Sequence, residues 1–161
     1  MPFPTRPAAI ATAMLGLALT AFPAAAEEFR PLNTSVTLTG SLAITTDITN
    51  ACDVTINLSI DGSGNATMTG GSFAPGFAFC TWPASGPTST WTLTPGPGTS
   101  SVDMDIAFDM WGWSCAGTVD ADYDNTAGTL TFDNVGVPGD LGITCRIDGT
   151  LTSSPKMTII P

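Results

Sequence analysis

Carboxylates are the most abundant side chains in this sequence that could do chemistry. The 161 residues include fourteen Asp and Glu, four Lys and Arg, and no histidine. The absence of histidine excludes Ser-His-Asp and Cys-His catalysis and the usual zinc sites. A lysine-based dyad would depend on Lys156, the only lysine, close to the C-terminus. The sequence therefore predicts a protein that is not an enzyme and carries no cofactor.

Paired carboxylates could still hydrolyse glycosidic bonds, because that reaction needs two Asp or Glu side chains. Asp103 and Asp105 form one candidate pair, and a second acidic run begins at Asp120. Both runs occupy alternate positions of predicted strands, which places the carboxylates together on the solvent-facing side. We therefore favour a solvated acidic face over a polysaccharide hydrolase, which is the least favoured of three functions considered.

Calcium is a second use for these oxygen ligands, and two segments are weak candidates. Asp61 and Asn65 lie on the glycine-rich segment DGSGN, and Asp120, Asp122 and Asp124 alternate along DADYD. Calcium takes six to eight oxygen ligands, and neither segment continues into a complete binding loop with a bidentate Glu. The alternative, which we favour, is that both segments are hairpin turns, and no metal site is assigned.

Two tryptophans are candidates for binding to a surface. Trp111 and Trp113 have the parity of Asp109, opposite to that of Phe108 and Met110. If that face is outward, the indole rings could stack on sugars or grip apolar surfaces. The alternative is that a bulge near residue 112 turns them inward, or that both faces are buried.

Strands must position these groups, because apolar residues recur with a period of two. Residues 27–161 are rich in Thr, Ser, Gly, Asp and Asn, and this composition favours strands and tight turns over helices. We predict an all-β fold, an antiparallel β-sandwich or a barrel-like fold. The clearest strands are SVTLTGSLAIT from Ser35, VTINLSI from Val54 and VDMDIAFDM from Val102, with shorter ones at ATMT (66–69), WTLT (91–94), TLTF (129–132) and MTII (157–160).

The four cysteines suggest an internal duplication. When Cys52 is aligned with Cys115, Asp61 meets Asp124 and Cys80 meets Cys145. The sequence thus predicts two related hairpin units, at 35–94 and 101–160, although chance similarity between Thr-rich strands is a rival explanation. This duplication favours two disulfides, Cys52–Cys80 and Cys115–Cys145, whereas the nested pairing of Cys52 with Cys145 and Cys80 with Cys115 stays open.

The N-terminus predicts export. Residues 1–26 combine a basic start, an apolar run and small residues at Ala24 and Ala26, which is typical of a cleaved signal peptide. The mature chain, 27–161, is expected to be a single secreted domain with no membrane span. It contains fourteen Asp and Glu residues but only three basic residues, Arg30, Arg146 and Lys156. Such a strongly negative chain is not expected to bind nucleic acid or anionic lipid.

Two short motifs resemble the alkane-oxidation activators, the PraB-like family of small exported bacterial proteins. They are TLTG at Thr37 and C-x-x-x-GTLT-x-SP from Cys145 to Pro155. The resemblance implies a secreted or surface-attached protein linked to growth on hydrophobic substrates and to biofilm matrix, with no catalytic residues. We expect a non-catalytic β-protein whose partner is a hydrophobic surface, a matrix component or itself. The alternative is a fibre subunit assembled by strand addition through SVTLTGSLAIT.

Overall fold

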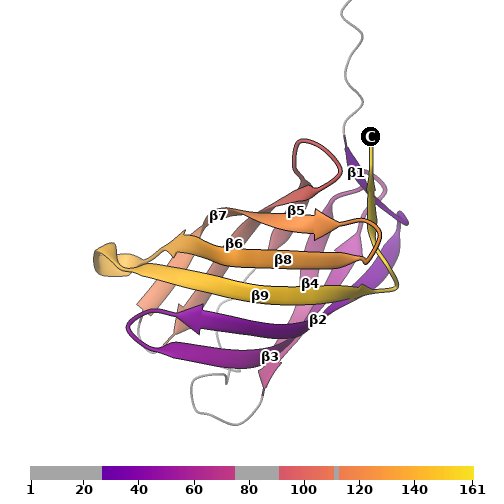
Figure 1. Ribbon diagram of the computed structural model, residues 1–161. Coiled ribbons are helices and arrows are strands. Elements are labelled where there is room, and N and C mark those ends of the chain that lie inside the picture. The colour runs from indigo at the N-terminus through magenta and orange to yellow at the C-terminus, as the bar shows by residue number, and fades with distance from the viewer. Residues whose placement is uncertain (1–26, 75–90, 111–112) are drawn as a thin grey trace, which may run out of the picture.

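The computed structural model describes residues 27–74, 91–110 and 113–161, apart from the side chains of residues 109, 110 and 113. This part of the chain is all β, as predicted, with one short 3-10 turn (Figure 1). None of its helices is long or apolar enough to cross a bilayer. The strands are β1 (Glu28–Arg30), β2 (Thr34–Thr45), β3 (Thr49–Ile60), β4 (Ala66–Ala74), β5 (Thr92–Pro95), β6 (Ser101–Met110), β7 (Trp113–Asp124), β8 (Thr129–Pro138), β9 (Thr144–Ser154) and β10 (Thr158–Ile160), and the 3-10 turn η1 is Asp140–Gly142.

Strands β2 to β9 form a closed antiparallel barrel in sequence order, and β9 returns to pair with β2. Of the two architectures that the sequence allowed, the barrel is therefore the observed one. Each successive pair of strands is a neighbouring antiparallel pair. The segment 96–100, rich in Gly and Pro, is the β5–β6 turn, which joins the two four-stranded halves.

The apolar residues of the period-two pattern point into the barrel. Along β6 the even-numbered residues from Val102 to Phe108 are buried, whereas Asp105 is exposed on the opposite face. The same parity holds on β2 and β3, as expected for strands with one face on a core. The inward residues of these two strands are Val36, Leu38, Leu42, Ile44, Val54, Ile56, Leu58 and Ile60, all buried.

A two-stranded sheet of β1 and β10 covers one end of the barrel (Figure 1). It buries Phe29 and Ile159 completely or almost so. The backbone N–H of Phe29 donates to Gly64 O at 3.0 Å, and Gly64 has a φ of +77°. A Cβ there would lie 2.3 Å from Glu28 Cβ, so only glycine lets β1 pass this turn.

The C-terminal strand is attached by side chains of the β7–β8 turn region. Asn125 bonds the backbone of Ile159 twice, accepting from its N–H at 2.7 Å and donating to its C=O at 2.9 Å. Tyr123 Oη donates to Met157 O at 2.5 Å, and Ser153 Oγ accepts from Met157 N–H at 3.0 Å. This end of the barrel is therefore closed by hydrogen bonds as well as by apolar packing.

The Cys115–Cys145 disulfide connects β7 to β9, with the Cα atoms 6.3 Å apart. This pair was predicted, and it excludes the nested pairing in which Cys145 bonds Cys52. No cysteine in the described residues has a free thiol. The predicted Cys52–Cys80 pair involves residue 80, which lies outside the described residues.

The two hairpin units keep their status as a prediction. Strands β3 and β7, which carry the aligned Cys52 and Cys115, are four places apart in the eight-stranded barrel. Asp61 directly follows β3, whereas Asp124 is the last residue of β7, and each begins the turn that leads to the next strand.

Candidate functional site

The Asp61 segment is a hairpin turn built by its own carboxylate. Asp61 Oδ1 accepts the backbone N–H groups of Ser63 at 2.8 Å and Asn65 at 3.0 Å. These hydrogen bonds lower the pKa of Asp61 below its usual value. The carboxylate thus fixes the β3–β4 turn, in the way that Asx turns do.

Asp124 has the same role in the β7–β8 turn. Its Oδ1 accepts from Thr126 N–H at 2.7 Å and Ala127 N–H at 3.0 Å, and these bonds lower its pKa. Asp120 and Asp122 lie on the outward face of β7, both exposed. Within residues 27–74, 91–110 and 113–161, no three His, Cys, Asp or Glu side chains gather into a metal site. The five named oxygen donors stay weak calcium candidates, and no metal site is assigned to them.

One pair of carboxylates does meet across two strands. Asp103 of β6 lies directly opposite Asp120 of β7. A hydrogen bond with Asp120, desolvation and the charges of Asp120 and Asp105 raise the pKa of Asp103. The pair faces solvent on the outside of the barrel, whereas catalytic carboxylates are usually enclosed in a cleft that excludes water. This exposed pair of carboxylates is therefore only weak support for the polysaccharide hydrolase considered in the sequence analysis.

Trp111 and Trp113 were the candidates for binding to a surface. Trp111 lies outside the described residues. Trp113 begins β7 opposite Met110, and its side chain is also outside the described part. The prediction that these rings face outward and bind a surface stays a prediction.

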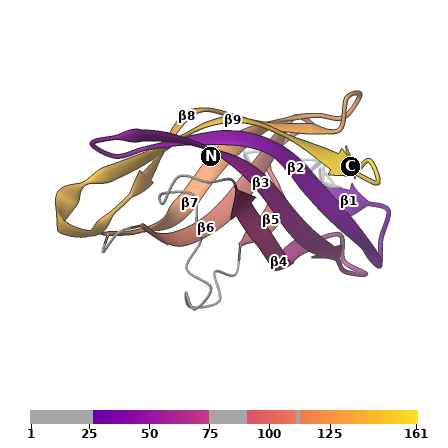
Figure 2. The same cartoon turned by 90° about the horizontal axis from the view of Figure 1, so that it is seen from below.

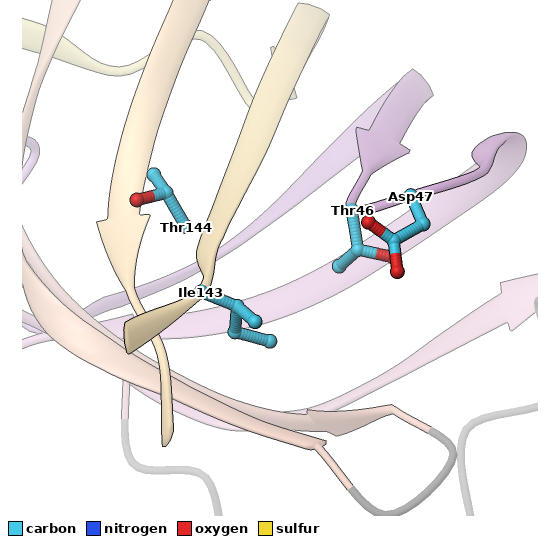
Figure 3. A pocket seen from close by; sticks show the side chains of 4 residues that line it. All are labelled: Thr46, Asp47, Ile143 and Thr144. Carbon is cyan, nitrogen blue, oxygen red and sulfur yellow. The ribbon is translucent and has the colours of Figure 1, made fainter. Parts of the chain in front are cut away.

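The structure reveals two exposed apolar residues that the sequence analysis missed. Ile48, in the β2–β3 turn, is 58% exposed, and Leu141, in the β8–β9 turn, is 89% exposed. A pocket of about 140 Å³ lies between these turns and is lined by Thr46, Asp47, Ile143 and Thr144 (Figure 3). The only signal in the sequence is a single apolar residue after an aspartate in each turn, TDIT and GDLG.

The comparison with family models decides the family. The model described as "Alkane oxidation protein activator PraA/PraB-like" matches residues 2–161. The chain belongs to this family. In the same comparisons no curated protein and no solved structure matched this PraA/PraB-like chain.

The two motifs that suggested the PraA/PraB-like family lie side by side in the barrel. Thr37 of the TLTG motif pairs with Ser154, and Thr39 pairs with Thr152 of the closing motif. The motifs therefore form the seam at which the last strand of the barrel meets the first. Their short Thr-rich pattern has a structural cause, since it alternates outward hydroxyls with inward leucines.

Proposed function

We propose that this PraA/PraB-like protein acts outside the cytoplasm as a non-catalytic β-barrel that brings cells into contact with hydrophobic substrates, at the cell surface or in the biofilm matrix. The family description, an activator of alkane oxidation, supports an accessory role. We infer that this accessory role is contact with the hydrophobic substrate and not its oxidation. The exterior of the barrel is therefore the relevant surface.

The observation that carries the proposal is the set of bulky apolar side chains that the described strands direct into the barrel. The inward side chains include Trp91, Phe132, Leu38 and Met104, each no more than 2% exposed. Eight strands enclose a space that side chains just fill, or that holds one small ligand. Here bulky apolar side chains occupy it, and β1 and β10 cover one end. An apolar substrate is thus expected to meet the outside of the barrel.

Export is supported by the Cys115–Cys145 disulfide. A buried structural disulfide such as Cys115–Cys145 is typical of proteins that fold in an oxidising compartment.

Strand addition is the weaker alternative. The segment SVTLTGSLAIT forms most of β2, which pairs with β3 on one side and, from Thr37 to Thr45, with β9 on the other. Closure of a barrel removes free strand edges. A fibre built through this segment would require the barrel to open, whereas contacts through outward side chains would not.

The experiment is adsorption of the exported protein to an emulsion of a liquid alkane. The protein is purified from the culture medium, mixed with hexadecane droplets, and measured in the aqueous phase after the droplets are removed. Depletion in proportion to droplet area, well beyond that of an equally acidic control protein, is expected. Depletion equal to that of the control protein would refute engagement with hydrophobic substrates.

A further inference from the structure

We infer that one end of the barrel attaches the protein to the hydrocarbon–water interface, with Ile48 and Leu141 as the side chains that enter the hydrocarbon. The turn end, as we call it, consists of residues 46–48 between β2 and β3 and residues 139–143 between β8 and β9. It lies away from β1 in both views of the molecule (Figures 1 and 2). This inference rests on the proposed function and specifies its contact surface.

Exposure distinguishes the turn end from the rest of the described surface. Within the described residues, three large hydrophobic side chains are exposed: Leu141 at 89%, Ile48 at 58% and Ile160 at 36%. The first two occupy the turn end, and Ile160 lies in β10 at the covered end. Single exposed apolar residues are common on proteins. Two of them in adjacent turns are therefore the feature that sets the turn end apart.

The backbone gives an independent reason to single out Leu141. Its φ is +56° and its ψ is 19°, the left-handed conformation that disfavours residues with a Cβ. The other described non-glycine residues with positive φ are Asn33 and Asn134, a residue type that tolerates this region. A leucine at position 141 is therefore unfavourable in two ways, because its apolar side chain is exposed to water and its backbone is left-handed. Strained residues of this kind are often found where a protein binds something.

The two turns lie next to each other. Thr46 and Asp47 line one side of the pocket at this end, and Ile143 and Thr144 line the other (Figure 3). Ile48 directly follows the first pair in sequence, and Gly142 alone separates Leu141 from the second pair. The turns that carry the two apolar side chains therefore flank the same pocket.

Charge favours an uncharged hydrocarbon over an anionic membrane. Asp47 precedes Ile48 and Asp140 precedes Leu141, while neither turn contains Lys or Arg. Attachment to anionic lipids normally uses clustered basic residues. A stable protein interface buries about 800 Å² on each partner, more than two turn side chains provide. A neutral alkane phase needs neither basic residues nor a large complementary face.

The test compares adsorption of four exported proteins to hexadecane droplets: the wild type, Ile48→Ser, Leu141→Ser and the double variant. Transfer of two aliphatic side chains predicts that the double variant partitions about 10- to 100-fold less. Ile160→Ser is the matched control, since it removes an exposed isoleucine at the opposite end, and its partitioning should equal that of the wild type. Leu141→Asn keeps a residue that accepts positive φ, so its lower adsorption would not reflect misfolding.

The outcomes separate this inference from the proposed function. Failure of the wild type to adsorb would refute both. Adsorption of the wild type and the double variant to the same extent, or an equal loss in Ile160→Ser, would overturn the turn-end inference and leave the proposed function standing. Binding to phosphatidylglycerol vesicles that is lost in the double variant would overturn the choice of hydrocarbon and make an anionic bilayer the target.

Discussion

Gly149 of β9 lies directly opposite Leu42 of β2, and the two strands are too close there for a side chain on Gly149. A Cβ at 149 would lie 2.3 Å from Ser41 O and 3.0 Å from Leu42 Cδ2. The φ of Gly149 is +138°, which L-residues rarely adopt. The glycine of the closing motif therefore permits the seam between the first and last strands of the barrel.

We predict that Gly149→Ala destabilises the barrel by about 2 kcal/mol or more, because it combines backbone strain with a collision at the seam. The measurement is the free energy of unfolding from urea denaturation. Gly70→Ala is the matched control, because Gly70 lies in β4 with open space around its Cβ position and no positive φ. Equal stability of the two variants would contradict this account of the seam.

Loss of the Cys115–Cys145 disulfide should lower stability by about 3–4 kcal/mol in the chain-entropy model, given the separation of 30 residues. Strands β7 and β8 pair only from Asp122 to Asp124, and Cys115 of β7 also forms an isolated bridge with Gly139, just after β8, so the disulfide reinforces a weakly paired part of the barrel. Urea denaturation of the Cys115→Ala/Cys145→Ala variant checks this value. An unchanged midpoint would mean that the strand pairing suffices there.

Local patterns were enough to predict a strand within most of the barrel strands, whereas β9 and the short β1 were not predicted. Alternation along β6, from Val102 to Phe108, defines its inward face within a single strand, and Asp61 and Asp124 mark turns through local hydrogen bonds. The choice between sandwich and barrel was not accessible in this way. It depends on the pairing of Thr37 with Ser154, residues far apart in the sequence that no local pattern connects.

The candidate site was predictable only in part, for a physical reason. Asp120 and Asp122 were correctly expected on an outward face, because period-two parity decides it. Ile48 and Leu141 were missed because an isolated apolar residue in a turn carries no periodic signal. Their exposure and the positive φ of Leu141 depend on the folded chain alone.

Asp103→Asn should stabilise the protein at neutral pH by about 0.5 kcal/mol, because it removes a like charge directly opposite Asp120. The raised pKa of Asp103 means that its protonated form is favoured in the folded state, so the gain should shrink as the pH falls toward 3.8. Asp105→Asn is the control. Asp105 accepts hydrogen bonds from Thr118 at 2.6 Å and Thr92 at 3.3 Å, so its replacement should not stabilise.

Acid should destabilise the protein through the two turn carboxylates. The pKa values of Asp61 and Asp124 are lowered by backbone N–H donors, so their contribution is complete above the unfolded value of 3.8 and is lost as the pH falls through the folded values. Urea midpoints measured from neutral pH down to about pH 2 should show this acid limb. The Asp61→Asn/Asp124→Asn variant can keep the turns, but its urea midpoint should fall less steeply with pH. An equally steep fall in the variant would mean that other acidic residues cause the acid destabilisation.

Tyr123→Phe should cost about 1–2 kcal/mol, because it removes the donor that bonds Met157 O at 2.5 Å inside the covered end. Burial also raises the pKa of Tyr123 above 10.0, so the stability it contributes is complete below that value and is lost as the pH rises through the folded pKa. Tyr123 is the only tyrosine, so its ionisation can be followed by absorbance in the folded and the urea-unfolded protein. Ionisation at the same pH in both states would contradict a buried hydroxyl that holds β10.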